Sequence, residues 1–133
     1  MKTLFKTIFL LLISVSSYAQ ENTSEVYFLR NTKSMGSLTK FEIFVDGVPL
    51  CKINNKQYII SNLPVGSHEF SIQMTGKKAK STTEKFALEI EEGKTYYFQV
   101  ETPGSVLGST SFVEITKNSA DIILPKLKEI KCE

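Results

Sequence analysis

The chain has 133 residues, with 16 basic and 14 acidic side chains, two cysteines, one histidine and no tryptophan. This length suits one ordinary domain with a sizeable core and leaves no room for a second. The near balance of charges gives no reason to expect binding of nucleic acid or of an anionic membrane surface.

The N-terminus has the organisation of a cleaved export signal. Lys2 and Lys6 form a charged start, residues 7–13 form a short apolar run, and residues 17–19 form a small-residue cleavage site. The apolar run is well short of the ~20 residues that span a bilayer. No cysteine follows the site to accept a lipid. We therefore expect an exported chain with no membrane span and no lipid anchor.

Beyond the leader, short runs rich in Phe, Tyr, Ile and Val alternate with Gly, Pro, Asn, Asp and Ser. No run before the tail has the i, i+3, i+4, i+7 apolar spacing of a helix. The expected strands span residues 26–30, 40–45, 48–53, 57–62, 67–74, 84–90, 95–101 and 111–115. About eight short strands at this spacing indicate an all-β fold, which we interpret as an antiparallel β-sandwich. The predicted layout is a signal peptide at 1–19, a polar leader at 20–24, one β-sandwich domain at 25–128 and a frayed tail at 129–133.

Turn chemistry predicts how the strands connect. Asp46-Gly47 is a strong hairpin signal, because a type I′ turn needs positive φ at both central residues. Pro49 cannot donate a ladder hydrogen bond, which predicts a position on an edge strand or at the start of a strand. Further turns are expected at 54–56, 63–66 and 91–94, and together the turns predict an antiparallel meander through the middle of the chain.

Alternation of apolar and polar residues predicts which side chains face the core. The expected inward residues are Phe70, Ile72, Phe86, Leu88, Ile90, Tyr96, Phe98 and Val100. Tyr97 then points to the other face, where an exposed ring could contact sugar or protein. The tail is ambiguous: Ser119 could cap a helical turn that Pro125 would stop, or the tail could form a final strand.

Cys51 and Cys132 are the only cysteines, and an exported chain meets a disulfide-permissive compartment. A bridge between them would tie the tail to an early strand. Two unpaired thiols are the alternative, because sequence spacing does not prove proximity. A metal site made of two distant cysteines and one histidine is not expected, since zinc ligands come in close pairs.

The remaining polar residues have simple structural interpretations. His68 follows a turn at the start of a strand without a nucleophile motif, which favours a structural role. Glu89, Glu91 and Glu92 cluster at a hairpin end, where solvation is a better explanation than glycosidase chemistry. Lys77, Lys78 and Lys80 form a basic loop, which we interpret as a solvated loop in preference to a binding site for an anionic ligand. No aromatic residues are interleaved for base stacking.

Several segments together resemble the bacterial family called domain of unknown function 2846. The residues that carry this likeness are 26–30, 36–37, 44–50, 63–70 and 92–98. The resemblance implies a sandwich of immunoglobulin-like or PEGA-like appearance in an envelope protein with no assigned activity, and it places His68 at a recurring position after the Pro-x-Gly turn. Many members are lipoproteins, and this chain departs from them by lacking the lipid-accepting cysteine.

Two functional hypotheses follow. The first is a non-enzymatic periplasmic or cell-surface module, without cofactor, that contacts an envelope protein or glycan through loops or an open sheet edge. The second is a small secreted enzyme or inhibitor-like protein whose site is assembled from scattered polar residues. A deep pocket with converging charged groups would favour the second hypothesis, and a filled core would favour the first.

Overall fold

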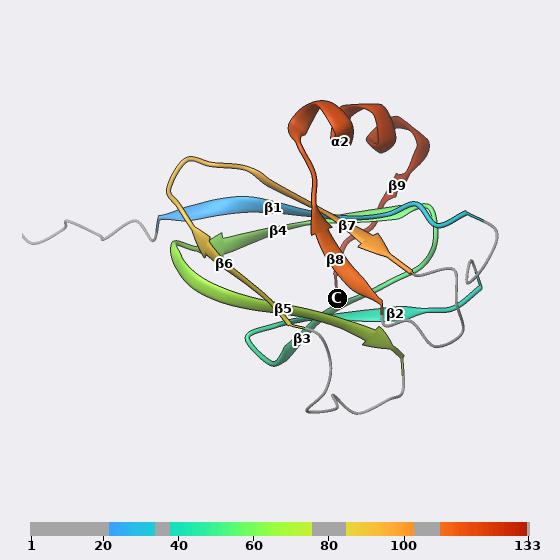
Figure 1. Cartoon of the computed structure of the whole chain (residues 1–133), viewed down its shortest axis with the longest axis horizontal. Helices are drawn as coiled ribbons and strands as arrows, with labels where there is room; N and C mark the ends of the chain where they lie inside the picture. The colour runs from blue at the N-terminus through green and yellow to red at the C-terminus, as the bar shows by residue number, and fades with distance from the viewer. Residues whose placement is uncertain (1–21, 34–37, 76–84, 103–109, 133) are drawn as a thin grey trace, which may run out of the picture.

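The computed structural model describes residues 22–33, 38–75, 85–102 and 110–132. These residues form two facing β-sheets, with a short helix on the outer side of one of them (Figure 1). The predicted all-β sandwich is confirmed. The expected signal peptide and the loop with Lys77, Lys78 and Lys80 lie outside the described residues.

The first sheet has the strand order β8-β7-β1-β4-β9, and the second has the order β3-β2-β5-β6. The first contains β1 (Thr23–Arg30), β4 (Gln57–Pro64), β7 (Tyr96–Glu101), β8 (Ser111–Glu114) and β9 (Lys128–Glu129). The second contains β2 (Phe41–Val45), β3 (Val48–Ile53), β5 (Gly66–Met74) and β6 (Phe86–Ile90). All the predicted strands are present within a few residues of their expected ends, and β9 is additional.

The predicted meander is wrong, because the chain changes sheets at three of the four expected turns: at 54–56, at 63–66 and, between β6 and β7, at 91–94. β2 and β3 form the expected hairpin. After residues 54–56 the chain leaves that sheet, and β4 pairs with β1 in the other one. At Val65 it crosses back, and β5 pairs with β2. Turn residues specify a local change of direction and not the sheet that the next strand joins, so turn chemistry could not predict these crossings.

The Asp46-Gly47 turn has the backbone that was predicted for it. Asp46 has φ 52° and Gly47 has φ 77°, the positive values that a type I′ hairpin requires. Pro49 lies on β3, at the edge of its sheet, as its missing N–H predicted. A bulge between Ile43 and Phe44 shifts the β2–β3 register next to this turn.

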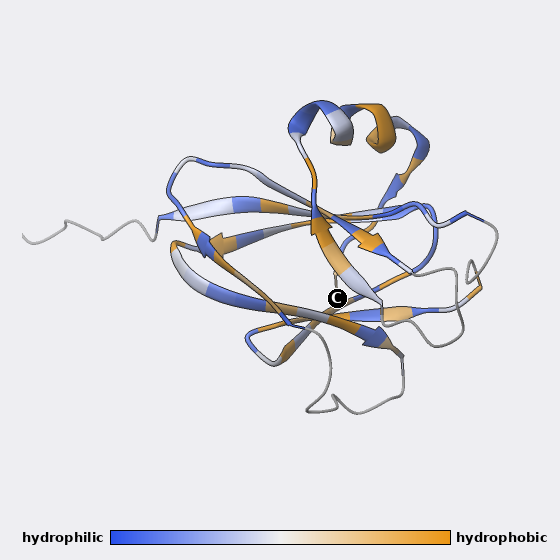
Figure 2. Cartoon of the chain, in the orientation of Figure 1, coloured by the Kyte–Doolittle hydropathy of each residue, from blue (hydrophilic) through white to orange (hydrophobic). Residues whose placement is uncertain are grey.

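The core fills the space between the sheets and is built largely from phenylalanine rings. Phe28 lies with its ring centroid 5.4 to 5.9 Å from those of Phe70, Phe98 and Phe112. Of the residues expected inside, Phe70, Ile72, Ile90, Tyr96, Phe98 and Val100 are buried, and Phe86 and Leu88 are half-buried against the same cluster. Figure 2 shows hydrophobic and hydrophilic residues alternating along several of the strands. Burying each such side chain stabilises the fold by about 1.5–3 kcal/mol.

The tail forms a helix as well as a strand. Helix α2 (Lys117–Ile123) continues into the 3-10 turn η1 (Leu124–Lys126) and then into β9. Thr116 is the N-cap and accepts a hydrogen bond from the backbone N–H of Ser119, so the predicted cap at Ser119 is three residues too late. The helix lies on the outer face of the first sheet (Figure 1), where Ala120 is buried against Leu29.

Residues 129–132 are tethered, whereas the tail was predicted to be frayed over 129–133, of which Glu133 lies outside the described residues. The backbone N–H of Lys128 donates to the carbonyl of Lys56 at 2.9 Å, and that of Ile130 donates to the carbonyl of Tyr58 at 3.0 Å. Ile130 also packs against the core. The edge of β4 therefore binds the tail as a short parallel strand.

Candidate functional site

The ring of His68, in β5, contacts both the β2–β3 turn and the end of β4. Its Nδ1 lies 2.7 Å from Oδ2 of Asp46, in the β2–β3 turn, and its Nε2 lies 2.7 Å from the carbonyl oxygen of Pro64, at the end of β4. The other carboxylate oxygen of Asp46 accepts the backbone N–H of Glu69 at 2.9 Å. A carboxylate and a carbonyl can only accept, so both ring nitrogens donate and the imidazole is the charged form.

The pKa values of the two side chains shift in the direction that this geometry requires. Burial lowers the pKa of His68, but its hydrogen bonds to Asp46 and Pro64, together with the charges of Asp46 and Glu89, outweigh burial and raise the pKa above the usual 6.5. The backbone N–H of Glu69 and then the ring of His68 lower the pKa of Asp46 below 3.8. A general base needs a free lone pair, and His68 has none while these bonds persist. Its contacts are those of a structural residue.

Cys51 and Cys132 are joined in a disulfide, with Cα atoms 5.2 Å apart across a separation of 81 residues. Cys51 belongs to β3 at the edge of the second sheet, and Cys132 follows β9 at the edge of the first. The bond therefore links the two sheets at the side of the sandwich where their edge strands β3 and β9 lie. Of the two states that the sequence left open, the structure contains the bridged one.

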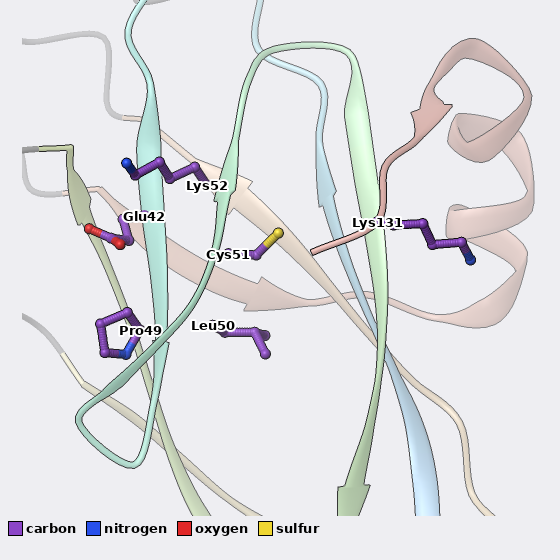
Figure 3. A pocket seen from close by; sticks show the side chains of 6 residues that line it. All are labelled: Glu42, Pro49, Leu50, Cys51, Lys52 and Lys131. Carbon is purple, nitrogen blue, oxygen red and sulfur yellow. The ribbon is translucent and has the colours of Figure 1, made fainter. Parts of the chain in front are cut away.

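A pocket of about 410 Å³ lies beside this bond, between β3 and the tail. It is lined by Glu42, Pro49, Leu50, Cys51, Lys52 and Lys131. Figure 3 shows the side chains of Leu50 and Cys51 directed toward the tail, whereas those of Lys52 and Lys131 point in opposite directions. The two lysines thus do not converge on one ligand. A second pocket, of about 250 Å³, lies where β1 and β7 end and includes Lys33 and Glu101.

Tyr97 is not the exposed aromatic residue that was predicted. It does point away from the inter-sheet core, as alternation requires, but α2 covers that face and leaves the side chain 9% exposed. Its ring centroid lies 4.9 Å from that of Tyr27, which in turn stacks against Tyr58. A partly exposed pair, Tyr27 and Tyr58, therefore lies at the margin of this covered cluster.

The glutamates around the β6–β7 connection are exposed, and Glu89 and Glu91 make local contacts. Glu89 accepts a hydrogen bond from the hydroxyl of Ser67. Glu91 pairs with Lys94, and its backbone carbonyl accepts from the hydroxyl of Ser24 at 2.7 Å. The exposed Glu89, Glu91 and Glu92 line neither pocket. These glutamates are solvated, as the sequence favoured, but the connection is not the expected hairpin, because β6 and β7 lie in different sheets.

Arg30 is a buried charge that sequence reasoning missed. Its side chain is fully buried, its guanidinium lies 4.4 Å from the ring centroid of Phe41, and it donates to the carbonyls of Thr39 and Ile53. Burial lowers the pKa of this guanidinium. A charged residue that ends a strand is normally solvated, so only its place after the buried run of β1 could have signalled this position.

Among the described residues, no three His, Cys, Asp or Glu side chains lie close enough together to hold a metal ion. Within the same ranges, no helix is long and apolar enough to cross a membrane.

These features define a small two-sheet β-sandwich whose sheets are linked by a disulfide. The family model described as "Protein of unknown function (DUF2846)" matches residues 20–111, and the chain belongs to this family. The matched segment contains His68 and Cys51, whereas α2, β9 and Cys132 lie beyond it. A search among curated proteins found no match to the chain.

Proposed function

We propose that this protein is a non-enzymatic binding or structural module of the bacterial envelope, exported to the periplasm or cell surface. The observation that carries the proposal is the inter-sheet disulfide between Cys51 and Cys132. Such structural bonds form and persist in oxidising compartments, and the leader at residues 1–19 has the pattern of an export signal.

The arrangement of polar groups supports a role without catalysis. The space between the sheets is filled by aromatic and aliphatic side chains. Both nitrogens of His68 bind acceptors, and the lysines of the larger pocket diverge (Figure 3). An enzyme of this size would need converging acid, base or nucleophilic groups in a concave site. We infer that the module acts by contact with an envelope protein or glycan, through its loops or a free sheet edge.

The first test concerns export. The full chain is expressed in a Gram-negative host, the cells are fractionated, and the intact mass of the protein is measured. We expect a periplasmic or released protein that begins at Gln20 and has no free thiol. The matched control is Leu11→Arg, which interrupts the apolar run and should leave an uncleaved, reduced protein in the cytoplasm. A native chain that stays in the cytoplasm with Met1 intact would overturn the proposal.

The second test concerns the partner. The tagged mature protein is cross-linked in intact envelopes, and the captured protein or glycan is identified by mass spectrometry and then rebound in purified form. Saturable binding without chemical change of the partner supports a binding module. Turnover of the purified partner would instead establish the enzyme hypothesis.

A further inference from the structure

Each sheet ends in strands that have one unpaired side among the described residues, and such edges promote unwanted pairing unless they are protected. β3 is protected by Pro49, by exposed Lys52 and by the adjacent bulge. β8 has only four residues, and its one charged residue, Glu114, has no cation within the strand that could pair with it in a second copy. β9 has only two residues. Three of the four edges are therefore short or blocked.

The edge formed by β6 has neither a proline nor a bulge, and the exposed charges at its two ends, Lys85 and Glu89, are of opposite sign. Its five residues contain no proline, and its pairing with β5 runs without a register shift from Phe86 to Ile90. Phe86 and Leu88 face the core but remain half-buried, because no further strand within the described ranges covers their outer side. This edge is regular and has partly exposed apolar side chains along it.

The sequence of this edge is complementary to itself. It reads Lys85-Phe86-Ala87-Leu88-Glu89, so an antiparallel copy centred on Ala87 places a cation opposite an anion at both ends. Residues of the same parity share a face of the sheet, so Lys85 and Glu89 meet on the outer face. Phe86 and Leu88 likewise meet on the core face. Ala87 is small enough to lie opposite its own copy on a two-fold axis.

We propose that the protein self-associates by antiparallel pairing of β6 with β6 of a second copy, in the register centred on Ala87. Lys85 lies opposite the partner's Glu89, and Phe86 lies opposite the partner's Leu88. The two second sheets become one continuous sheet across a two-fold axis, which is the usual symmetry of a homodimer. Within one chain, Lys85 pairs with Glu69 at 2.9 Å and Glu89 binds Ser67, so both end groups already lie on the outer face. The pairing does not depend on the exported role proposed above.

The first experiment measures self-association of the oxidised mature protein by sedimentation velocity over a wide range of concentrations. A dimer is expected. Glu89→Lys should weaken it about tenfold or more, because two cross-strand attractions become repulsions. Lys85→Glu combined with Glu89→Lys should restore the dimer. The matched control is Lys52→Glu, which reverses a charge on the protected edge β3 of the same sheet and should leave the dissociation constant unchanged. Melting temperature verifies that each variant is folded.

The second experiment tests the register by oxidative cross-linking. Ala87→Cys should form a covalent dimer, because directly opposite residues of antiparallel strands have Cα atoms about 4.5–5.5 Å apart, within disulfide range. Lys85→Cys alone should not cross-link. A mixture of Lys85→Cys and Glu89→Cys proteins should give the mixed dimer.

A protein that is monomeric at every concentration would overturn the proposal. So would a dimer that Glu89→Lys does not weaken, or one in which Ala87→Cys fails to cross-link, since another surface would then be responsible.

Discussion

Two contacts hold the strands of the second sheet to their surroundings, and they are chemically opposite. At the side of the sandwich where β3 and β9 lie, Cys51 is bonded covalently to Cys132. At the turn end, His68 joins Asp46 to Pro64 through two hydrogen bonds that need a charged ring. The disulfide does not depend on pH, and a reductant breaks it. The hydrogen bonds of His68 do not depend on a reductant, and a change of pH that alters the charge of His68 or Asp46 breaks them. The fold therefore combines two restraints that fail under different conditions.

Removal of the disulfide should have the largest effect. Changing both cysteines to alanine, or reducing the native protein, should lower the free energy of unfolding by about 3–5 kcal/mol, because an 81-residue separation is released in the unfolded chain. The denaturation midpoint with and without reductant measures this loss. The double variant serves as the control, since reductant should not destabilise it further. Equal midpoints for the oxidised and reduced native protein would contradict the prediction.

The second largest effect on stability is expected at the Asp46-Gly47 turn. Gly47→Val should lower the free energy of unfolding by about 1–3 kcal/mol, because a β-branched residue is strained at φ 77°. A Cβ at this position would meet no atom within 4 Å, so the cost is conformational and not a steric clash. Gly47→Asn is the control, since asparagine tolerates positive φ, and it should cost much less. An unchanged midpoint for the valine variant would show that the turn does not need this conformation.

The polar contact should stabilise the fold only within a limited pH range. The raised pKa of His68 means that its contribution is complete below the unfolded pKa of about 6.5 and is lost as pH rises through the folded pKa. The lowered pKa of Asp46 means that its contribution is complete above about 3.8 and is lost as pH falls through the folded pKa. Because Asp46 is half-exposed, we expect Asp46→Asn to cost about 1 kcal/mol between these limits.

The measurement is the denaturation midpoint of the native protein and of Asp46→Asn from pH 3 to pH 9. The difference between the two should be greatest near pH 5 and should shrink toward both ends. His68→Gln is the companion variant, and the Asp46→Asn difference should shrink in its background without vanishing, because the backbone N–H of Glu69 still donates to Asp46. A difference that stays constant with pH would mean that the charged pair does not contribute.

The smallest effect should come from the cap of α2. Thr116→Ala removes the side chain that accepts from Ser119, and it should cost about 0.5–1 kcal/mol. Thr116→Ser keeps the hydroxyl and should cost less. Hydrogen exchange of the amide of Ala120 provides a local measurement. Faster exchange in the alanine variant alone is expected, and equal rates in both variants would rule out the cap.

Much of this fold could be predicted from the sequence, because strands and turns are specified by residues that are close together in the chain. Alternation identified Phe70, Phe98 and the other inward residues, and Asp46-Gly47 specified its own turn. Alternation also predicted the direction of Tyr97 correctly. Its burial depends on α2, which begins 20 residues later in the chain and packs on that face. The alternation of residues within the strand carries no information about this helix.

The candidate site was less predictable for the same reason. Cys51 and Cys132 were recognised as a potential pair, but their proximity depends on the path of the tail. His68 was assigned a structural role, but its contact with Asp46 depends on how β2 and β5 are aligned. Arg30 was not identified, because the carbonyls that it binds come from other segments.

The central position of β1 has a consequence for the order of folding. Its neighbours are β4 and, in parallel, β7, so Val26 finds its partner Tyr96 only after 70 more residues have been made. A chain that emerges from its N-terminus cannot complete the first sheet until nearly all of it is available. Folds dominated by such distant pairings form slowly. The chain should therefore stay unfolded and accessible to chaperones for most of its synthesis.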